Sequence, residues 1–364
     1  MVEELVWVDF DFIEQFMVDV FLELGVPIED AEICADVLIT SDKRGIDSHG
    51  VNRLKPMYYD RIRAGVQFPK AKPEIVRETS TTAVIEGNRG MGHSTAKHAM
   101  ALAIEKAKEH GLGMVVVRNS THYGIAGYYV LMAVESGMIG ITGTNARPSV
   151  SPTYGVEPML GTNPLTVGMP TDEDYPFVLD PATSIIQRGK VEVHARSGEP
   201  IPPGLVIDSN GDYLTDPDDI LEKILQKEAS FLPIGGKAET GGYKGYGYSA
   251  VVEILSSALQ GGAFLQAITG VNVGHFFMAI DVEAFTDLAS FKKTTGDILR
   301  ALRNSKRMPS EPRIYTAGEK EHLAWLERQN KGVPLNKSLR DEVVTMRDEL
   351  GLDTVFPWER EVGG

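Results

Sequence analysis

The chain has 364 residues, of which 42% are hydrophobic, and its 51 acidic and 36 basic side chains give a net charge of −15. This size supports a full hydrophobic core, and the single cysteine, Cys34, excludes a small disulfide-stabilised scaffold. The acidic balance, without a basic run, argues against nucleic acid as a partner, and an anionic substrate would need a local cluster of cations.

The N-terminus, MVEELVWVDFDF, lacks the basic segment and small-residue cleavage site of a signal peptide. A lone cysteine also fits a reducing compartment, so we expect a cytoplasmic protein. The most apolar stretch, residues 249–268, is interrupted by Glu253, Gln260 and two glycines, which favours a buried helix over a membrane span.

The N-terminal region is predicted to be helical. Asp9 is expected to cap a helix that ends at Gly25, and a second helix follows Pro27 and ends near Arg44. A third helix is expected over residues 52–64. Because Pro56 is tolerated only near a helix start, His49 should lie on the preceding turn.

The middle of the chain has a different pattern, since short β-rich runs are bounded there by Gly, Pro, Asn and Asp. The runs are TTAVIEG, MVVVRN, GMIGITGT, PLTVGMP, PFVLDPA and KVEVHA. Two helices, over 93–110 and 124–136, interrupt them, so the alternation of strand and helix fails after Gly137. The pattern predicts an α+β fold with one mixed or antiparallel sheet, followed by helices over 217–227, 245–260, 284–304, 318–330 and 336–350.

The ordinary phosphate-binding fingerprints are missing, because the sequence contains neither G-x-G-x-x-G after a predicted strand nor G-x-x-x-x-G-K-[ST]. The nearest segment is GGYKGYG, residues 241–247, a glycine-rich loop that enters a helix. Its backbone N–H groups and lysine could hold a pyrophosphate, although glycines in such a place also serve ordinary turns.

One group of candidate site residues lies within Asp47-Ser48-His49-Gly50-Val51-Asn52-Arg53, at a turn that enters a helix. A guanidinium at Arg53 can bind a carboxylate in a bidentate manner, and an imidazole at His49 can exchange a proton near neutral pH. The alternative is structural: Ser48 caps the helix, and His49 and Arg53 bond to the backbone or to surface carboxylates.

A second candidate, His122, lies in Asn119-Ser120-Thr121-His122-Tyr123-Gly124, where a predicted strand turns into a helix. Polar residues at a strand's carboxyl end commonly line a crevice. His122 is therefore a second proton carrier, an orienting group for a substrate oxygen, or a histidine bonded within its turn. The other histidines, at 93, 98, 110, 194, 275 and 322, are expected to be structural, and no ligand motif predicts a metal.

Five strings in the same order resemble the malate/L-lactate dehydrogenase family, whose members reduce 2-oxo acids with NAD or NADP and lack the Rossmann fold. The strings are GIDSHGVNRL, NSTHYGIAGYY, LGTNPLTVGMPT, LDPATS with Gly189-Lys190, and GGYKGYGYSAVVEILSSAL. The resemblance covers nearly the whole chain.

The resemblance implies roles residue by residue. Ser48 and His49 match an active-site motif, Arg53 a clamp for the substrate carboxylate, and His122 the other active-site histidine, with the choice of acid/base between the histidines left open. Asn163 would shape the cleft. The implied cofactor contacts are Asp180, Pro181, Ala182, Thr183, Lys244, Gly245, Gly318 and Glu319. The family's Pro-Gly-Glu reads Ala317-Gly318-Glu319 here, a departure at the last contact.

The resemblance also implies the reaction: hydride transfer between NAD or NADP and a small 2-hydroxy acid or 2-oxo acid, malate or lactate first. Sulfolactate or ureidoglycolate dehydrogenase and cyclic imino acid reductase are the alternatives, and a ligand-binding protein without catalysis is the competing class. A 2'-phosphate would find cations at Arg188, Lys190 and Arg196. A homodimer or a larger even assembly is implied.

Three units are expected. Residues 1–75 form a helical region packed with C-terminal helices in 306–364, residues 76–250 a β-rich cofactor domain, and residues 251–305 a small helical subdomain.

Overall fold

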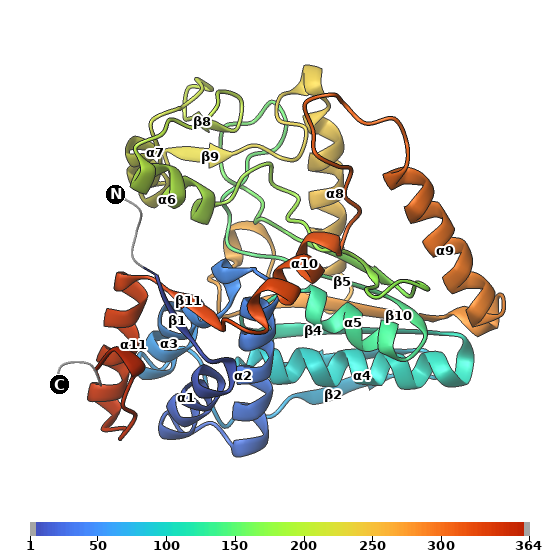
Figure 1. Ribbon diagram of the computed structural model, residues 1–364, viewed down its shortest axis with the longest axis horizontal. Coiled ribbons are helices and arrows are strands. Elements are labelled where there is room, and N and C mark those ends of the chain that lie inside the picture. Colours follow the sequence, from blue (N-terminus) through green and yellow to red (C-terminus); the bar gives the residue numbers. More distant parts are fainter. Residues whose placement is uncertain (1–4, 360–364) are drawn as a thin grey trace.

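The computed structural model describes residues 5–359, apart from the side chain of Arg196 (Figure 1). Within these residues a seven-stranded sheet has the order β2-β3-β4-β10-β5-β6-β7. The strands are β2 Glu74–Glu78, β3 Thr82–Glu86, β4 Leu112–Ser120, β5 Met138–Thr144, β6 Leu165–Met169, β7 Phe177–Leu179 and β10 Val273–Asp281. Strands β3 and β4 are parallel, and the other neighbours in this sheet are antiparallel. A Rossmann fold needs a parallel sheet, so the predicted α+β class with a mixed sheet is confirmed.

Helices cover both faces of this sheet (Figure 1). Helices α4 Gly92–His110 and α5 Gly127–Glu135 pack on one face, and α8 Gly242–Leu255 on the other. Because side chains alternate along a strand, Val115 and Val117 of β4 join the core under α4, while Val116 packs with Val252 of α8.

The first and last parts of the chain share one hydrophobic core. It holds α1 Phe10–Glu23, α2 Ile28–Lys43 and α11 Lys337–Leu350, beside the pair of β1 Val6–Val8 and β11 Val333–Leu335. The predicted cap is confirmed, since the Asp9 carboxylate accepts a hydrogen bond from Phe12 N at 3.1 Å. Helix α1 ends just before Gly25, whose φ of 83° suits glycine.

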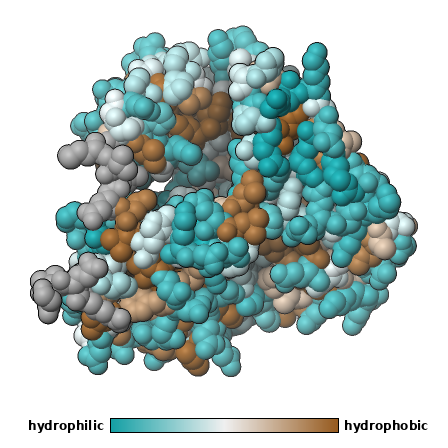
Figure 2. Space-filling model, in the orientation of Figure 1, coloured by the Kyte–Doolittle hydropathy of each residue, from teal (hydrophilic) through white to brown (hydrophobic). Residues whose placement is uncertain are grey.

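A smaller unit has a core of its own above the sheet (Figure 1). It contains α6 Arg188–Ser197, β8 Val206–Asp208, α7 Pro217–Gln226 and β9 Ala229–Phe231. The surface is hollowed between this unit and the N-terminal helices (Figure 2). The remaining long helices are α9 Leu288–Arg303 and α10 Glu319–Arg328, and with α7, α8 and α11 they confirm the helices predicted beyond Pro203. In residues 5–359, no helix has the length and apolar character that crossing a membrane requires.

The run KVEVHA, expected to be a strand, is part of α6. Its alternating valines imitate a half-buried strand, but Val191 packs in the core beside α7 whereas Val193 is 51% exposed. Gly198, with φ 67°, ends the helix in a left-handed conformation. Packing against α7 therefore overrides the strand pattern.

Strand β10 was not expected, and it lies within residues 251–305, for which helical structure was expected. It pairs with both β4 and β5 at the centre of the sheet. A central strand is buried on both faces, so its sequence VGHFFMAID is a nearly continuous apolar run without the alternation that marks a strand.

The helix expected over residues 52–64 is also corrected. A 3-10 turn over Val51–Arg53 leads into a π-helical segment, Leu54–Tyr59, and only then into the short α3, Asp60–Arg63. Pro56 lies inside this π-helical segment. Such segments shift side chains relative to an α-helix and are often found at functional sites.

Candidate active site

The two histidines singled out in the sequence lie side by side. The rings of His49 and His122 are stacked, with centroids 5.8 Å apart and an angle of 23° between their planes. They come from separate parts of the chain: His49 lies in the 3-10 turn Asp47–His49 after α2, and His122 follows β4. The tertiary fold therefore joins the two predicted groups in one site.

The loop that carries His49 is held in place by Asp42, a buried residue of α2. Its carboxylate accepts a hydrogen bond from Val51 N at 2.8 Å. A Cβ atom at Gly50 would lie only 1.9 Å from Asp42 Oδ1, so a glycine is required there. Arg328 of α10 bonds to the Asp42 carbonyl at 2.7 Å and to the Asp47 carboxylate at 2.9 Å. The C-terminal part of the chain thus helps to hold the site.

Within this loop the predicted residues bond to one another. Ser48 Oγ lies 2.9 Å from His49 Nδ1, and Arg53 Nε donates to the Ser48 carbonyl at 2.6 Å. These bonds orient the imidazole and leave the two terminal nitrogens of Arg53 without a hydrogen-bond partner in the described part of the chain. Burial lowers the pKa of Arg53, while the negative charge of Glu192 in α6 raises it and the positive charge of Arg188 lowers it.

His122 has two buried neighbours that the sequence analysis did not select. The Tyr58 hydroxyl lies 2.5 Å from His122 Nδ1 and 2.9 Å from His93 Nε2. Tyr58 belongs to the π-helical segment and His93 to the first turn of α4. Both side chains are fully buried. His93 was expected to be structural, and no sequence signal links it to His122, since only the fold makes them neighbours.

The site keeps its imidazoles neutral. Burial, and after it the charge of Arg53, lower the pKa of His49 to about 4. Burial also lowers the pKa of His122 well below its usual value, and the lowering by His49, His93, Arg53 and Arg61 adds to it. A neutral imidazole at pH 7 can accept a proton or donate a hydrogen bond.

Two more guanidinium groups gather beside the site. Arg61 Nη1 donates to the Gly270 carbonyl at 2.8 Å, and a Cβ atom at Gly270 would lie 3.2 Å from Arg147 Nε. Burial lowers the pKa of Arg61, and the neighbouring Arg147 lowers it again. Among residues 5–359, neither these arginines nor Arg53 has a carboxylate within ion-pair distance. This is the local cation cluster that an acidic protein needs to bind an anion.

The predicted cofactor residues around β7 are held largely by bonds within the protein. Both carboxylate oxygens of Asp180 are engaged: Oδ2 accepts from Gly127 N at 2.7 Å, and Oδ1 accepts from Thr166 Oγ1 at 2.6 Å. The Pro181 carbonyl accepts from Leu165 N at 3.3 Å, and Ala182 is half-buried beside it. Asp180 therefore ties α5, and with it the His122 turn, to β6 and β7.

Thr183 and Asn163 also form their side-chain hydrogen bonds within the protein. Thr183 Oγ1 donates to the Asn163 carbonyl at 2.9 Å. The buried Asn163 amide donates to Glu253 at 2.8 Å and accepts from Ala146 N at 3.2 Å. Asn163 therefore fixes the loop that carries Arg147, and its implied role in shaping the cleft stays a prediction.

The glycine-rich segment forms the start of α8. A Cβ atom at Gly245 would lie 2.2 Å from the Ile234 carbonyl, so this glycine allows close packing. The N–H groups of Gly242 and Lys244 already donate to carbonyls of the preceding turn, each at 2.9 Å. The side chains offer more: Lys244 and Lys237 are exposed, and neither is ion-paired among the described residues. Two unpaired lysines fit the charge of a diphosphate.

Gly318 and Glu319 lie at the opposite end of β7 from Asp180. Gly318 has φ 91°, and a Cβ atom there would lie 2.5 Å from the Pro176 carbonyl. Glu319 is buried, accepts from Thr316 N at 3.1 Å and is ion-paired with Arg313. Gly318 lines a cavity of about 280 Å³ between α2 and α10, while the Glu319 carboxylate is used within the protein.

Of the cations named for a 2'-phosphate, Arg188 is paired with Glu192 at 2.8 Å, and Lys190 is exposed. The side chain of Arg196 lies outside the described residues.

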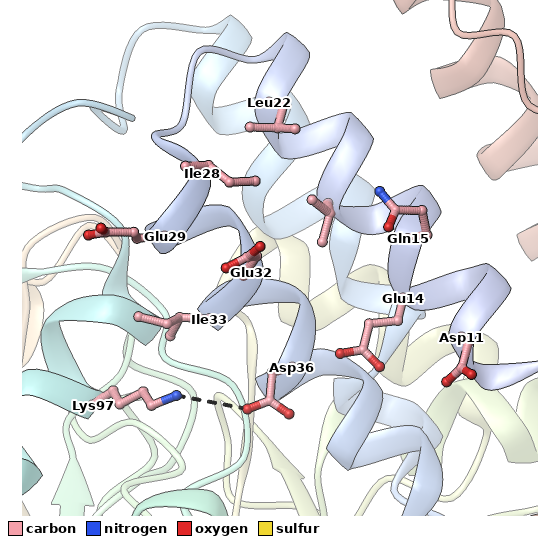
Figure 3. A pocket seen from close by; sticks show the side chains of 11 residues that line it. Asp11, Glu14, Gln15, Leu22, Ile28, Glu29, Glu32, Ile33, Asp36 and Lys97 are labelled. Carbon is pink, nitrogen blue, oxygen red and sulfur yellow. Dashed lines mark ion pairs between the residues drawn. The ribbon is translucent and has the colours of Figure 1, made fainter.

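A larger cavity of about 940 Å³ lies away from the histidines, between α1, α2 and α4. Figure 3 shows carboxylates of α1 and α2 around it, with Lys97 of α4 4.0 Å from Asp36. None of the predicted site residues lines it. In the described part of the chain, no group of three or more His, Cys, Asp or Glu residues is arranged to hold a metal ion.

Comparison with known proteins agrees with this geometry. A sequence profile described as malate/L-lactate dehydrogenase matches residues 8–344. The chain belongs to the malate/L-lactate dehydrogenase family. It is therefore an oxidoreductase that acts on the CH–OH group of 2-hydroxy acids, and enzymes of this kind use a nicotinamide cofactor.

Individual relatives support the assignment. A malate dehydrogenase of Pyrococcus abyssi is 44% identical over 356 residues, 96% of each chain. An L-sulfolactate dehydrogenase of Methanocaldococcus jannaschii is 38% identical and covers 93% of this chain and 96% of its own. The crystal structure of a malate dehydrogenase from Entamoeba histolytica superposes with a TM-score of 0.94 at 45% identity, over 97% of this chain and all of that one.

Proposed function

We propose that this family member interconverts malate and oxaloacetate. The observation that carries the proposal is the pair of neutral imidazoles, 5.8 Å apart, beside three guanidinium groups without carboxylate partners in the described residues. The family relationship provides the reaction type, and the names of the most similar relatives point to a 2-hydroxy acid with a second anionic group.

Each part of such a substrate has a counterpart in the site. Arg53 would bind the carboxylate next to the reacting carbon, because its two terminal nitrogens are available. Arg61 and Arg147 would bind the second carboxylate. His49 or His122 would exchange the proton of the 2-hydroxyl group. A bound nicotinamide would supply hydride transfer.

The residues fit a dinucleotide, with Lys237 and Lys244 as partners for its diphosphate. NAD and NADP are both compatible with this arrangement. Lys190 is the exposed cation that remains for a 2'-phosphate, because Arg188 is paired with Glu192.

A homodimer is part of the proposal. The outer face of α8 and the turn after it expose Val251, Ile254 and Leu259, at 46%, 57% and 53%. Apolar side chains clustered on one helix face are typical of an interface between copies. Light scattering coupled to gel filtration would give the mass in solution.

The test is a set of initial rates with malate, sulfolactate and lactate, each with NAD and with NADP. We expect kcat/KM for malate to exceed that for lactate at least about tenfold, because a charge-assisted hydrogen bond contributes roughly 1.5 to 3 kcal/mol. Arg61→Leu should abolish most of this preference. Equal rates with lactate would contradict the role of Arg61 and Arg147, and no turnover with any of these acids would contradict the proposed function.

A further inference from the structure

We propose that Tyr58 and His93 are positioning residues that hold His122 in the neutral tautomer with its proton on Nε2. The chain of hydrogen bonds would run from His93 Nε2–H to the Tyr58 oxygen, and from the Tyr58 hydroxyl to His122 Nδ1. His122 would then present a hydrogen-bond donor, and not a lone pair, to a substrate oxygen. The role in catalysis rests on the proposed function, whereas the tautomer itself does not.

The direction of the chain follows first from Gly124. Its backbone N–H points at His122 Nδ1, at 3.3 Å, and a backbone N–H only donates. Nδ1 therefore acts as an acceptor and carries no proton. The Tyr58 hydroxyl, 2.5 Å away, must then donate to the same nitrogen. The proton of neutral His122 is left on Nε2.

His93 gives a second, independent argument. Once Tyr58 donates to His122, its oxygen accepts from His93 Nε2 at 2.9 Å. His93 Nδ1 is buried and has no partner among the described residues. In the proposed direction this atom is an unpaired acceptor, whereas the reverse direction would leave an unpaired N–H. An orphaned buried N–H is the rarer and costlier of the two.

Burial keeps the hydrogen-bonded groups of His93, Tyr58 and His122 neutral. It raises the pKa of Tyr58 well above its usual value and lowers the pKa of His93 to about 3. At pH 7.5 each of the three groups is neutral and has one proton to place, and the Gly124 N–H selects the direction in which these protons are arranged. The other edge of His122, which carries Nε2, is the one left for a ligand because the residue is only half-buried.

The backbone makes room for this contact. Gly124 has φ 79°, and a Cβ atom there would lie 3.1 Å from His93 Nε2 and 2.5 Å from Val37 Cγ1. A Cβ atom at Gly92 would lie 2.3 Å from the His122 carbonyl. Two glycines thus let the His122 turn approach the start of α4, where His93 lies.

The consequence is a division of roles between the histidines. A neutral imidazole with Nε2–H polarises a carbonyl oxygen and stabilises the alkoxide that hydride addition would produce. His49, whose Nδ1 is bonded to Ser48, is then the candidate for net proton exchange with the substrate.

The test is ¹⁵N NMR of the histidine-labelled, ligand-free protein at pH 7.5, with assignment by comparison with His122→Gln. We expect the protonated nitrogen of His122 to be Nε2 in the wild type, and a mixture of tautomers in Tyr58→Phe. His93→Gln keeps an N–H donor for Tyr58 and should preserve the tautomer. His93→Leu removes that donor and should give a mixture of tautomers, as in Tyr58→Phe. Tyr59→Phe is the matched control, since the Tyr59 hydroxyl donates to Glu349 at 2.6 Å and takes no part in the hydrogen bonds between His93, Tyr58 and His122.

Activity gives the second readout. Tyr58→Phe should lower kcat roughly 10- to 100-fold with little change in KM, as expected when a partner that orients a functional histidine is lost. His93→Gln should stay near the wild type and His93→Leu should follow Tyr58→Phe. A proton on Nδ1 of His122 in the wild-type protein would overturn the proposal, and so would an unchanged tautomer in both Tyr58→Phe and His93→Leu. The NMR result needs no substrate, so it stands or falls separately from the proposed function.

Discussion

The proposed substrate side and the proposed cofactor side of the site are built differently. On the substrate side, His49, His122 and Arg53 point polar groups outward that find no complete set of partners within residues 5–359. On the cofactor side, the polar side-chain atoms of Asp180 and Thr183 form hydrogen bonds within the protein. A residue that belongs to a family motif can therefore act directly on a ligand or only support the backbone that does.

The difference predicts separate outcomes for mutations on the two sides. Changes on the substrate side should affect turnover and leave stability nearly constant. Changes at internally bonded residues of the cofactor side should affect the free energy of unfolding as well.

The largest effect is expected at His122. His122→Gln should lower kcat/KM at least about a hundredfold, because the donor aimed at the substrate oxygen is lost or misplaced. Steady-state rates with malate or oxaloacetate measure this. His98→Gln, an exposed position on α4, is the control and should behave as the wild type. Wild-type turnover in His122→Gln would place the chemistry elsewhere.

The next effect is expected at Arg53. Arg53→Lys should raise KM for the substrate about tenfold to a hundredfold, because a lysine cannot form the bidentate pair with a carboxylate. Arg63→Lys, whose side chain is ion-paired with Glu349, is the control. An unchanged KM would show that Arg53 does not bind the carboxylate.

On the cofactor side we expect a contrast between two variants. Asp180→Ala should reduce the free energy of unfolding by about 2 kcal/mol, because the N–H of Gly127 and the hydroxyl of Thr166 lose their acceptor. Lys244→Gln should leave the melting temperature unchanged and weaken cofactor binding several-fold. Thermal melts and fluorescence titration with NADH or NADPH measure both, and equal stability of the two variants would contradict the comparison.

The smallest effect concerns pH. The pKa of buried His93 is about 3 in the folded protein, against an ordinary value of 6.5. As the pH falls below 6.5, the unfolded chain takes up a proton that the folded protein does not, so the free energy of unfolding decreases towards pH 3. Urea unfolding at pH 7 and pH 5 should show a smaller decrease for His93→Gln than for the wild type. An identical decrease would mean that His93 is protonated in the folded protein.

Local signals in the sequence predicted much of the helical structure. The Asp9 cap, the Gly25 stop and the long helices beyond Pro203 were correct because capping and helical periodicity act over a few residues. The errors share a cause. The KVEVHA run has the alternation of a strand, but its packing against α7 makes it part of a helix. Strand β10 has no periodic pattern because both of its faces are buried.

The sequence by itself determined the family and the fold class and selected His49, Arg53 and His122 as candidate site residues, because these lie in contiguous strings that can be recognised without knowing how the chain folds. Only the tertiary structure decided that the two histidines meet, that Tyr58 and His93 stand behind His122, and that Arg61 and Arg147 meet at Gly270. The physical reason is that hydrogen bonds and charges act over a few ångströms of space. Tyr58 and His122 are 64 positions apart in the chain, and a linear pattern does not record their proximity.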